Sequence, residues 1–66
     1  MENGNQRFLN KHCKLQRMDG FCLFGIPREI TETYILFETP QKTSMIGLSD
    51  VRELCLDPKY YGEMIL

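Results

Sequence analysis

The chain has 66 residues, of which 42% are hydrophobic, and its formal net charge is −1. A chain this short forms one small domain at most, expected here over residues 1–66, and its core supplies little stability. The near-zero charge excludes a long-range attraction to nucleic acid or to an anionic membrane. A contact with phosphates would therefore need a local basic patch.

The three cysteines, Cys13, Cys22 and Cys55, are an odd number without a C-x-x-C pair. We expect reduced thiols that pack as small apolar side chains, which fits a cytoplasmic protein. A zinc site from His12 and the cysteines would have a spacing that fits no common pattern, so we expect no metal and no cofactor. Residues 1–10 lack the apolar segment of a signal peptide, and no apolar run reaches the ~20 residues that span a bilayer, so we expect no membrane contact.

The N-terminal segment is expected to be a frayed end followed by one helical turn. Residues 1–6 are polar, as frayed termini usually are. Asn5 is a suitable N-cap for a short helix that ends at Asn10 and lays Phe8 and Leu9 on the rest of the molecule. Such a helix is too short to be stable without that contact.

The stretch from residue 13 to residue 39 organises the chain. Asp19-Gly20 separates two strand-like runs, and Asp-Gly is a strong hairpin signal because glycine adopts a positive φ at no steric cost. The run before it alternates apolar and polar residues, and the run Phe21–Phe24 is apolar throughout. Gly25 then predicts a bulge or a bend.

Further strands are expected after this hairpin. Pro27 lacks an N–H group and must lie at an edge or a bulge. Residues 28–33 are polar and are expected to turn, and Tyr34–Phe37 is expected to be the most buried strand. After a polar connection at residues 39–43, residues 44–48 resume an extended pattern.

Residues 49–56 have two interpretations. Apolar residues in the segment have helical spacing, and Ser49 is a possible N-cap. However, Arg52 stands where a capping box has Glu or Gln. We favour a tight turn at residues 49–50 followed by a last strand, Val51–Leu56, and keep a short helix as the alternative. Residues 57–66 are expected to form a C-terminal tail.

Five short strands with tight connections predict an all-β fold, a small and partly open five-stranded barrel with a short N-terminal helical turn. Such a barrel leaves strand edges that recruit partners. The expected core consists of Cys13, Leu15, Phe21, Leu23, Ile30, Ile35, Phe37, Ile46, Leu48, Val51 and Leu54.

Leu15, the Asp19-Gly20 turn, Leu23 and Gly25 are spaced as a strand, a turn and a strand that bends at a glycine. In this spacing the chain resembles the Sm-like superfamily of SH3-like barrels, which includes the bacterial Sm-like RNA-binding proteins. The resemblance covers about residues 8–56. It implies an Sm/SH3-like barrel, RNA binding and a ring of subunits whose edge strands pair.

The first functional hypothesis is a non-enzymatic RNA-binding or RNA-associated regulatory protein. The RNA-contact motif is incomplete, because Ile35 and Gly47-Leu48 stand where many Sm proteins carry base-reading and charged residues. Basic residues near the N-terminus can contact phosphates, or they can form a solvated face. The resemblance implies a base-stacking side chain near Tyr34, which is otherwise a barrel residue with its hydroxyl at the rim. The candidate RNA-binding residues are Lys11, Lys14, Arg17 and Tyr34.

The second hypothesis is a small protein-binding regulator or inhibitor that acts through a barrel edge and the C-terminal tail. The strand at residues 44–48 has no inward charge and no proline, which are the features that protect an edge. We expect a homo-oligomer joined by this strand against Val51–Leu56 of the next subunit. The tail can fold back over its own barrel or dock on a partner. The candidate interface residues are Met45, Ile46, Leu48, Tyr60, Tyr61 and Met64.

Catalysis has little support in the sequence. His12 and Cys13 are neighbours in a strand, so their side chains point to opposite faces and cannot form a dyad. The glycines are not arranged as a phosphate-binding loop. We therefore expect no enzymatic activity.

Overall fold

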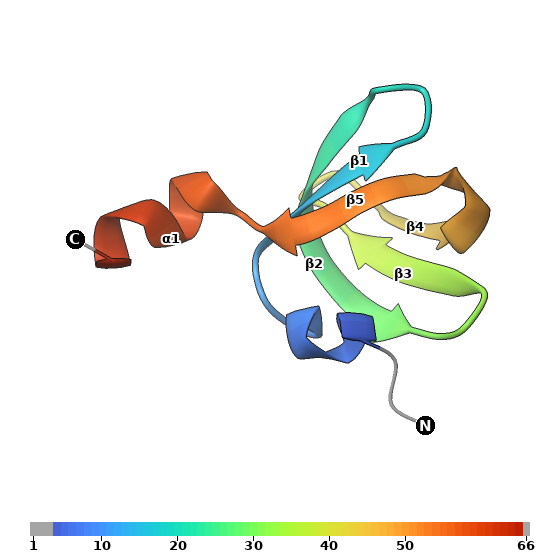
Figure 1. Ribbon diagram of the computed structural model, residues 1–66, viewed down its shortest axis with the longest axis horizontal. Helices are drawn as coiled ribbons and strands as arrows, with labels where there is room; N and C mark the ends of the chain where they lie inside the picture. The colour runs from blue at the N-terminus through green and yellow to red at the C-terminus, as the bar shows by residue number, and fades with distance from the viewer. Residues whose placement is uncertain (1–3, 66) are drawn as a thin grey trace.

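The computed structural model describes the backbone of residues 4–65 and the side chains of residues 5–61 (Figure 1). The fold is mostly β with little helix, and it begins with the expected short helical turn, which is a 3-10 helix. Residues 4–6, which were expected to fray, belong to that helix. The elements are η1 (Gly4–Phe8), β1 (Cys13–Arg17), β2 (Cys22–Ile30), β3 (Tyr34–Glu38), β4 (Thr43–Gly47), η2 (Leu48–Asp50), β5 (Val51–Leu56) and α1 (Pro58–Ile65).

The five strands form one antiparallel sheet in the order β4-β3-β2-β1-β5. The sheet curls but does not close, because within residues 4–65 β4 pairs only with β3 and β5 pairs only with β1 (Figure 1). The 3-10 helix η2 connects these two end strands. Its ends are held by hydrogen bonds from Leu48 N to Thr33 O at 2.9 Å and from Met18 N to Asp50 O at 2.8 Å. Beyond η2, both end strands have free edges.

The β1–β2 hairpin turns at Asp19-Gly20, as predicted. Gly20 has a φ of 93°, a conformation that favours glycine. The Asp19 carboxylate accepts a hydrogen bond from Phe21 N at 2.9 Å and pairs with Arg17 at 3.3 Å. Local side-chain contacts therefore stabilise the turn, which explains why the sequence predicted it.

The strand β2 bends at Gly25, where it changes partner. Residues 22–25 pair with β1, and the second half of β2 pairs with β3. A Cβ atom at position 25 would overlap the carbonyl oxygen of Glu38 and lie 3.1 Å from a ring carbon of Phe37. Glycine is therefore required for the close approach of β2 to β3, and the predicted bend is confirmed.

Pro27 lies at a shift in register between Pro27 and Glu29, which is a bulge of the kind expected for a residue without an N–H group. The prediction that residues 28–33 turn is wrong for residues 28–30, which continue β2. Ile30 pairs with Ile35, and both side chains are buried. Burial of Ile30 thus extends the strand through a polar stretch.

The segment Val51–Leu56 is a strand, so the interpretation as a turn followed by a strand is confirmed and the helical alternative is wrong. Leu48 was expected to end the preceding strand, but it is the first residue of η2. Arg17 pairs with Val51 while Gln16 pairs with Glu53, which leaves one extra residue in β5. This bulge turns both Val51 and Leu54 toward the core.

The core lies inside the curl of the sheet. Its buried side chains are Phe8, Cys13, Leu15, Ile30, Ile35, Phe37 and Ile46, and Leu9, Leu23, Leu48, Val51 and Leu54 pack against them. Phe8 and Leu9 thus lie on the sheet as expected. Phe21 was predicted to be buried, and this is wrong, because its side chain is 58% exposed. It lies in the hairpin on the side where the sheet does not close, so no strand covers it.

The C-terminal segment contains the helix α1, which the sequence analysis did not predict. The Asp57 carboxylate accepts a hydrogen bond from Lys59 N at 2.8 Å. Pro58 occupies the first helical position, where a missing N–H group costs no hydrogen bond. Asp57-Pro58 therefore both ends β5 and starts α1, which runs away from the sheet (Figure 1).

Candidate binding surface on the open side of the sheet

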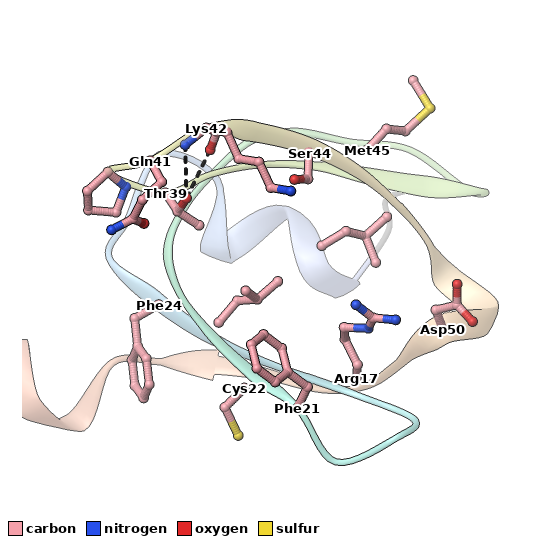
Figure 2. A pocket seen from close by; sticks show the side chains of 13 residues that line it. Arg17, Phe21, Cys22, Phe24, Thr39, Gln41, Lys42, Ser44, Met45 and Asp50 are labelled. Atoms are coloured by element: carbon pink, nitrogen blue, oxygen red, sulfur yellow. Dashed lines mark hydrogen bonds between the residues drawn. The ribbon is translucent and has the colours of Figure 1, made fainter.

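A groove of about 720 Å³ lies on the open side of the sheet, between the β1–β2 hairpin and β4 (Figure 2). We call it the open-side groove. It is lined by Arg17, residues 21–24, residues 39–42, residues 44–46 and Asp50. The volume lies within the range of about 300–1,000 Å³ that is typical of ligand sites.

The open-side groove combines an apolar surface with two cations. Phe21 and Met45 are 58% and 67% exposed. Arg17 and Lys42 extend into the groove from opposite walls (Figure 2). Phe21 lines the groove, whereas the Met45 side chain points away from it (Figure 2). Exposed apolar surface within a groove marks interaction sites in small proteins. The surface is therefore suited to a partner with apolar groups, while its charges are mixed, because Asp50 also lines the groove and Arg17 pairs with Asp19.

A smaller hollow of about 230 Å³ adjoins the open-side groove. The two share Phe24, Thr39 and Pro40. The smaller hollow continues to His12 and Asp57, where α1 begins, and we call it the helix-base hollow. The two hollows thus lie next to one another, between β4 and the base of α1.

The candidate RNA-binding residues lie in different surroundings. Lys14 stands on the outer face of β1, in line with Phe24 of β2 and Cys55 of β5. Lys11 is exposed in the connection before β1. Arg17 reaches the open-side groove but also pairs with the carboxylate of Asp19. Of these three cations, only Arg17 lines the groove.

Tyr34 begins β3, and its hydroxyl donates a hydrogen bond to the Glu29 carboxylate at 3.2 Å. This hydrogen bond and the negative charge of Glu29 raise the pKa of Tyr34. A carboxylate at the tip of the ring repels a phosphate. The contact supports the interpretation of Tyr34 as a rim residue rather than a base-stacking one.

The three interface candidates at residues 45–48 have different surroundings. The side chain of Met45 points outward from β4. Ile46 is buried in the core, so it can offer only its backbone to a partner. Leu48 is half-buried against the core in η2. Met45 and the free backbone edge are therefore the accessible parts of this candidate surface.

The tyrosines of the C-terminal segment make contacts within the chain. The ring of Tyr60 stacks on that of His12, with centroids 3.9 Å apart and planes 22° apart. His12 N donates a hydrogen bond to the Tyr61 hydroxyl at 3.0 Å. Tyr60 remains 51% exposed. The side chain of Met64, the third interface candidate of this segment, lies outside the described residues.

The cysteines are free, and Cys13 is fully buried. Its thiol donates a hydrogen bond to Phe8 O at 3.6 Å. Burial, with a contribution from Cys55, raises the pKa of Cys13 from 9.0 to about 11. This thiol is therefore an unreactive core side chain.

Two classes of site find no counterpart in the part of the chain that the structure describes. Among the described residues there is no group of three or more His, Cys, Asp or Glu side chains that could hold a metal ion. Within the same part of the chain, the helices are too short or too polar to cross a bilayer.

No family model matches the chain, and no curated protein matches it. Sequence analysis placed Phe21 in the core and gave no role to Phe24 or Lys42. The run Phe21–Phe24 was the signal that could have indicated this site, because it is apolar on both faces of the strand. The core covers only one of these faces, so the apolar residues of the other face remain exposed.

Proposed function

We propose that the protein is a non-enzymatic, protein-binding module that acts through the open-side groove and the free edge of β4, and that it self-associates there. The observation that carries this proposal is that β4 and β5 are the two end strands of one sheet and that each has one edge unpaired within residues 4–65. Exposed apolar side chains lie beside β4. An exposed edge offers unpaired N–H and C=O groups to another strand. The β5 strand of a second copy would satisfy these groups and cover Phe21.

The shape of the sheet supports the proposed pairing. The bend of β2 at Gly25 curls the sheet. We infer that this curl is that of a partly open Sm/SH3-like barrel, which the strand of a neighbour would complete. Antiparallel addition agrees with every other pair in the sheet. Three free cysteines support a reducing, cytoplasmic setting for this assembly.

Light scattering across a range of protein concentrations tests the proposal. We expect the wild type to have a mass several times that of the 7.8 kDa chain. Met45→Lys places a charge beside the edge and is expected to give a monomer. Met18→Lys is the matched control, because Met18 is 58% exposed but does not line the open-side groove, and this variant should assemble. A monomeric wild type at high concentration would refute the self-association.

RNA binding is the second candidate, and one observation favours it. The exposed ring of Phe21 lies in the same groove as Arg17 and Lys42, which suits a base and its phosphates. Titration with short single-stranded RNAs at several salt concentrations tests this candidate. An affinity no tighter than ~10⁻⁴ M at low salt would exclude it, since non-specific binding alone reaches that value.

A further inference from the structure

The helix α1 is anchored only through its first turn in the contacts that the described residues make. Asp57 N donates a hydrogen bond to His12 O at 3.0 Å, and Tyr61 and Tyr60 contact the backbone and the ring of the same histidine. These contacts determine the direction in which the helix leaves the sheet. The rest of α1 projects away from the body of the molecule (Figure 1).

An eight-residue helix is not stable in water by its propensity alone, because nucleation is costly and few bonds are made. Gly62 lowers the propensity further. The sequence of α1 continues with the apolar residues Met64 and Ile65. The helix therefore requires a surface to pack on, and its direction takes it away from its own sheet.

The proposed strand pairing brings such a surface into reach. In an antiparallel pair, the end of one strand lies beside the start of the other. The partner subunit's Leu56 would thus lie near Thr43, the first residue of β4. The partner subunit's α1 begins two residues later, so it would emerge beside the turn at residues 39–42.

We propose that α1 of one copy docks on the neighbouring copy, where the open-side groove meets the helix-base hollow. This inference rests on the proposed pairing of β4 with β5. The docking surface is Phe24, which is 48% exposed, together with Thr39 and Pro40, and these three residues line both hollows. Lys42 in the groove is opposite in charge to Glu63 of α1. The helix acts as a clamp that reinforces the strand pair.

Amide hydrogen exchange of the peptide 58–66, followed by mass spectrometry, tests the docking. We expect protection of this peptide to increase at least about tenfold as the protein concentration rises through assembly, because docking suppresses local unfolding of α1. Phe24→Ser is expected to abolish most of that increase. Met18→Ser is the matched control, since Met18 has a similar exposure and lies outside both hollows.

Light scattering on the same samples separates the two proposals. An assembled wild type whose α1 exchanges as fast as in dilute samples would overturn the docking and leave the strand pairing in place. Protection that does not depend on concentration, or that survives in assembled Phe24→Ser, would also overturn it. A wild type that stays monomeric would refute the strand pairing, and the docking with it.

Discussion

The two sides of the curled sheet have similar apolar residues but different fates. On the bent side, Phe37 is fully buried beside Gly25, where β2 and β3 approach closely. On the open side, Phe21 remains more than half exposed, although it belongs to an equally apolar run. The two phenylalanines are equally hydrophobic, and their burial differs because strands cover the first and no strand covers the second. Exposed apolar residues here indicate where the sheet lacks a partner strand.

Replacing one phenylalanine on each side gives the largest expected contrast. Phe37→Ala should lower the free energy of unfolding by about 4 kcal/mol, because it leaves a cavity in the core. Phe21→Ala should cost less than about 1 kcal/mol in the monomer, because its side chain is already in contact with water. Urea denaturation at one low protein concentration measures both, since self-association would add to the apparent stability. Equal losses would show that Phe21 is buried in the monomer.

The bend can be tested by adding a single methyl group. Gly25→Ala should destabilise the fold by about 3 kcal/mol, because its Cβ would overlap the backbone of β3. Gly20→Ala is the control, with open space around it and a cost of about 1 kcal/mol from its positive φ. Thermal unfolding compares the two variants. A Gly25 variant no less stable than the Gly20 variant would contradict the close approach of the strands.

The stability of the fold should depend on the protonation of Cys13. Because the pKa of Cys13 is raised by folding, the native state binds the proton more tightly, and stability is complete below pH 9 and falls as the pH rises through about 11. The loss is on the order of 2 kcal/mol. Chemical denaturation between pH 8 and pH 11 measures it. The Cys13→Ala variant should lose this part of the pH dependence. If the stability of the variant falls with pH as that of the wild type does, Cys13 is not the group responsible.

The smallest effect is expected at the rim. Tyr34→Phe removes the hydrogen bond to Glu29, which is exposed, so the free energy of unfolding should change by less than about 0.5 kcal/mol. Urea denaturation at neutral pH is sufficient to measure it. A loss above about 1.5 kcal/mol would show that the hydroxyl contributes to packing and is not a rim group.

Turns and bulges that depend on residues adjacent in the sequence could be predicted from the sequence. The turn at Asp19-Gly20 and the bulge at Pro27 follow from the conformational limits of glycine and proline. The turn before β5 was also found, because Ser49-Asp50 interrupts the apolar pattern. The helix α1 was missed, although Asp57-Pro58 is a helix-start signal, because the same pair also ends a strand.

The candidate site was less predictable than the fold. Lys14 and Arg17 are close in the sequence, but the alternation of β1 and the bulge beside Arg17 give them different surroundings. Phe21 and Lys42 lie far apart in the sequence, and they line one groove because β2 bends and β3, which leads to the turn at Lys42, pairs with the second half of β2. Hydrophobic periodicity over a few residues carries no information about contacts between residues that are distant in the sequence.

The sequence by itself determined the hairpin, the glycine at which β2 bends and the approximate positions of the five strands, because backbone dihedral limits and hydrophobic alternation act over a few residues. Only the tertiary structure decided which apolar residues are buried. It left Phe21 uncovered, tied Tyr60 and Tyr61 to His12, and separated the edges of β4 and β5. Burial depends on which strands cover a residue, and that follows from the curl of the whole sheet.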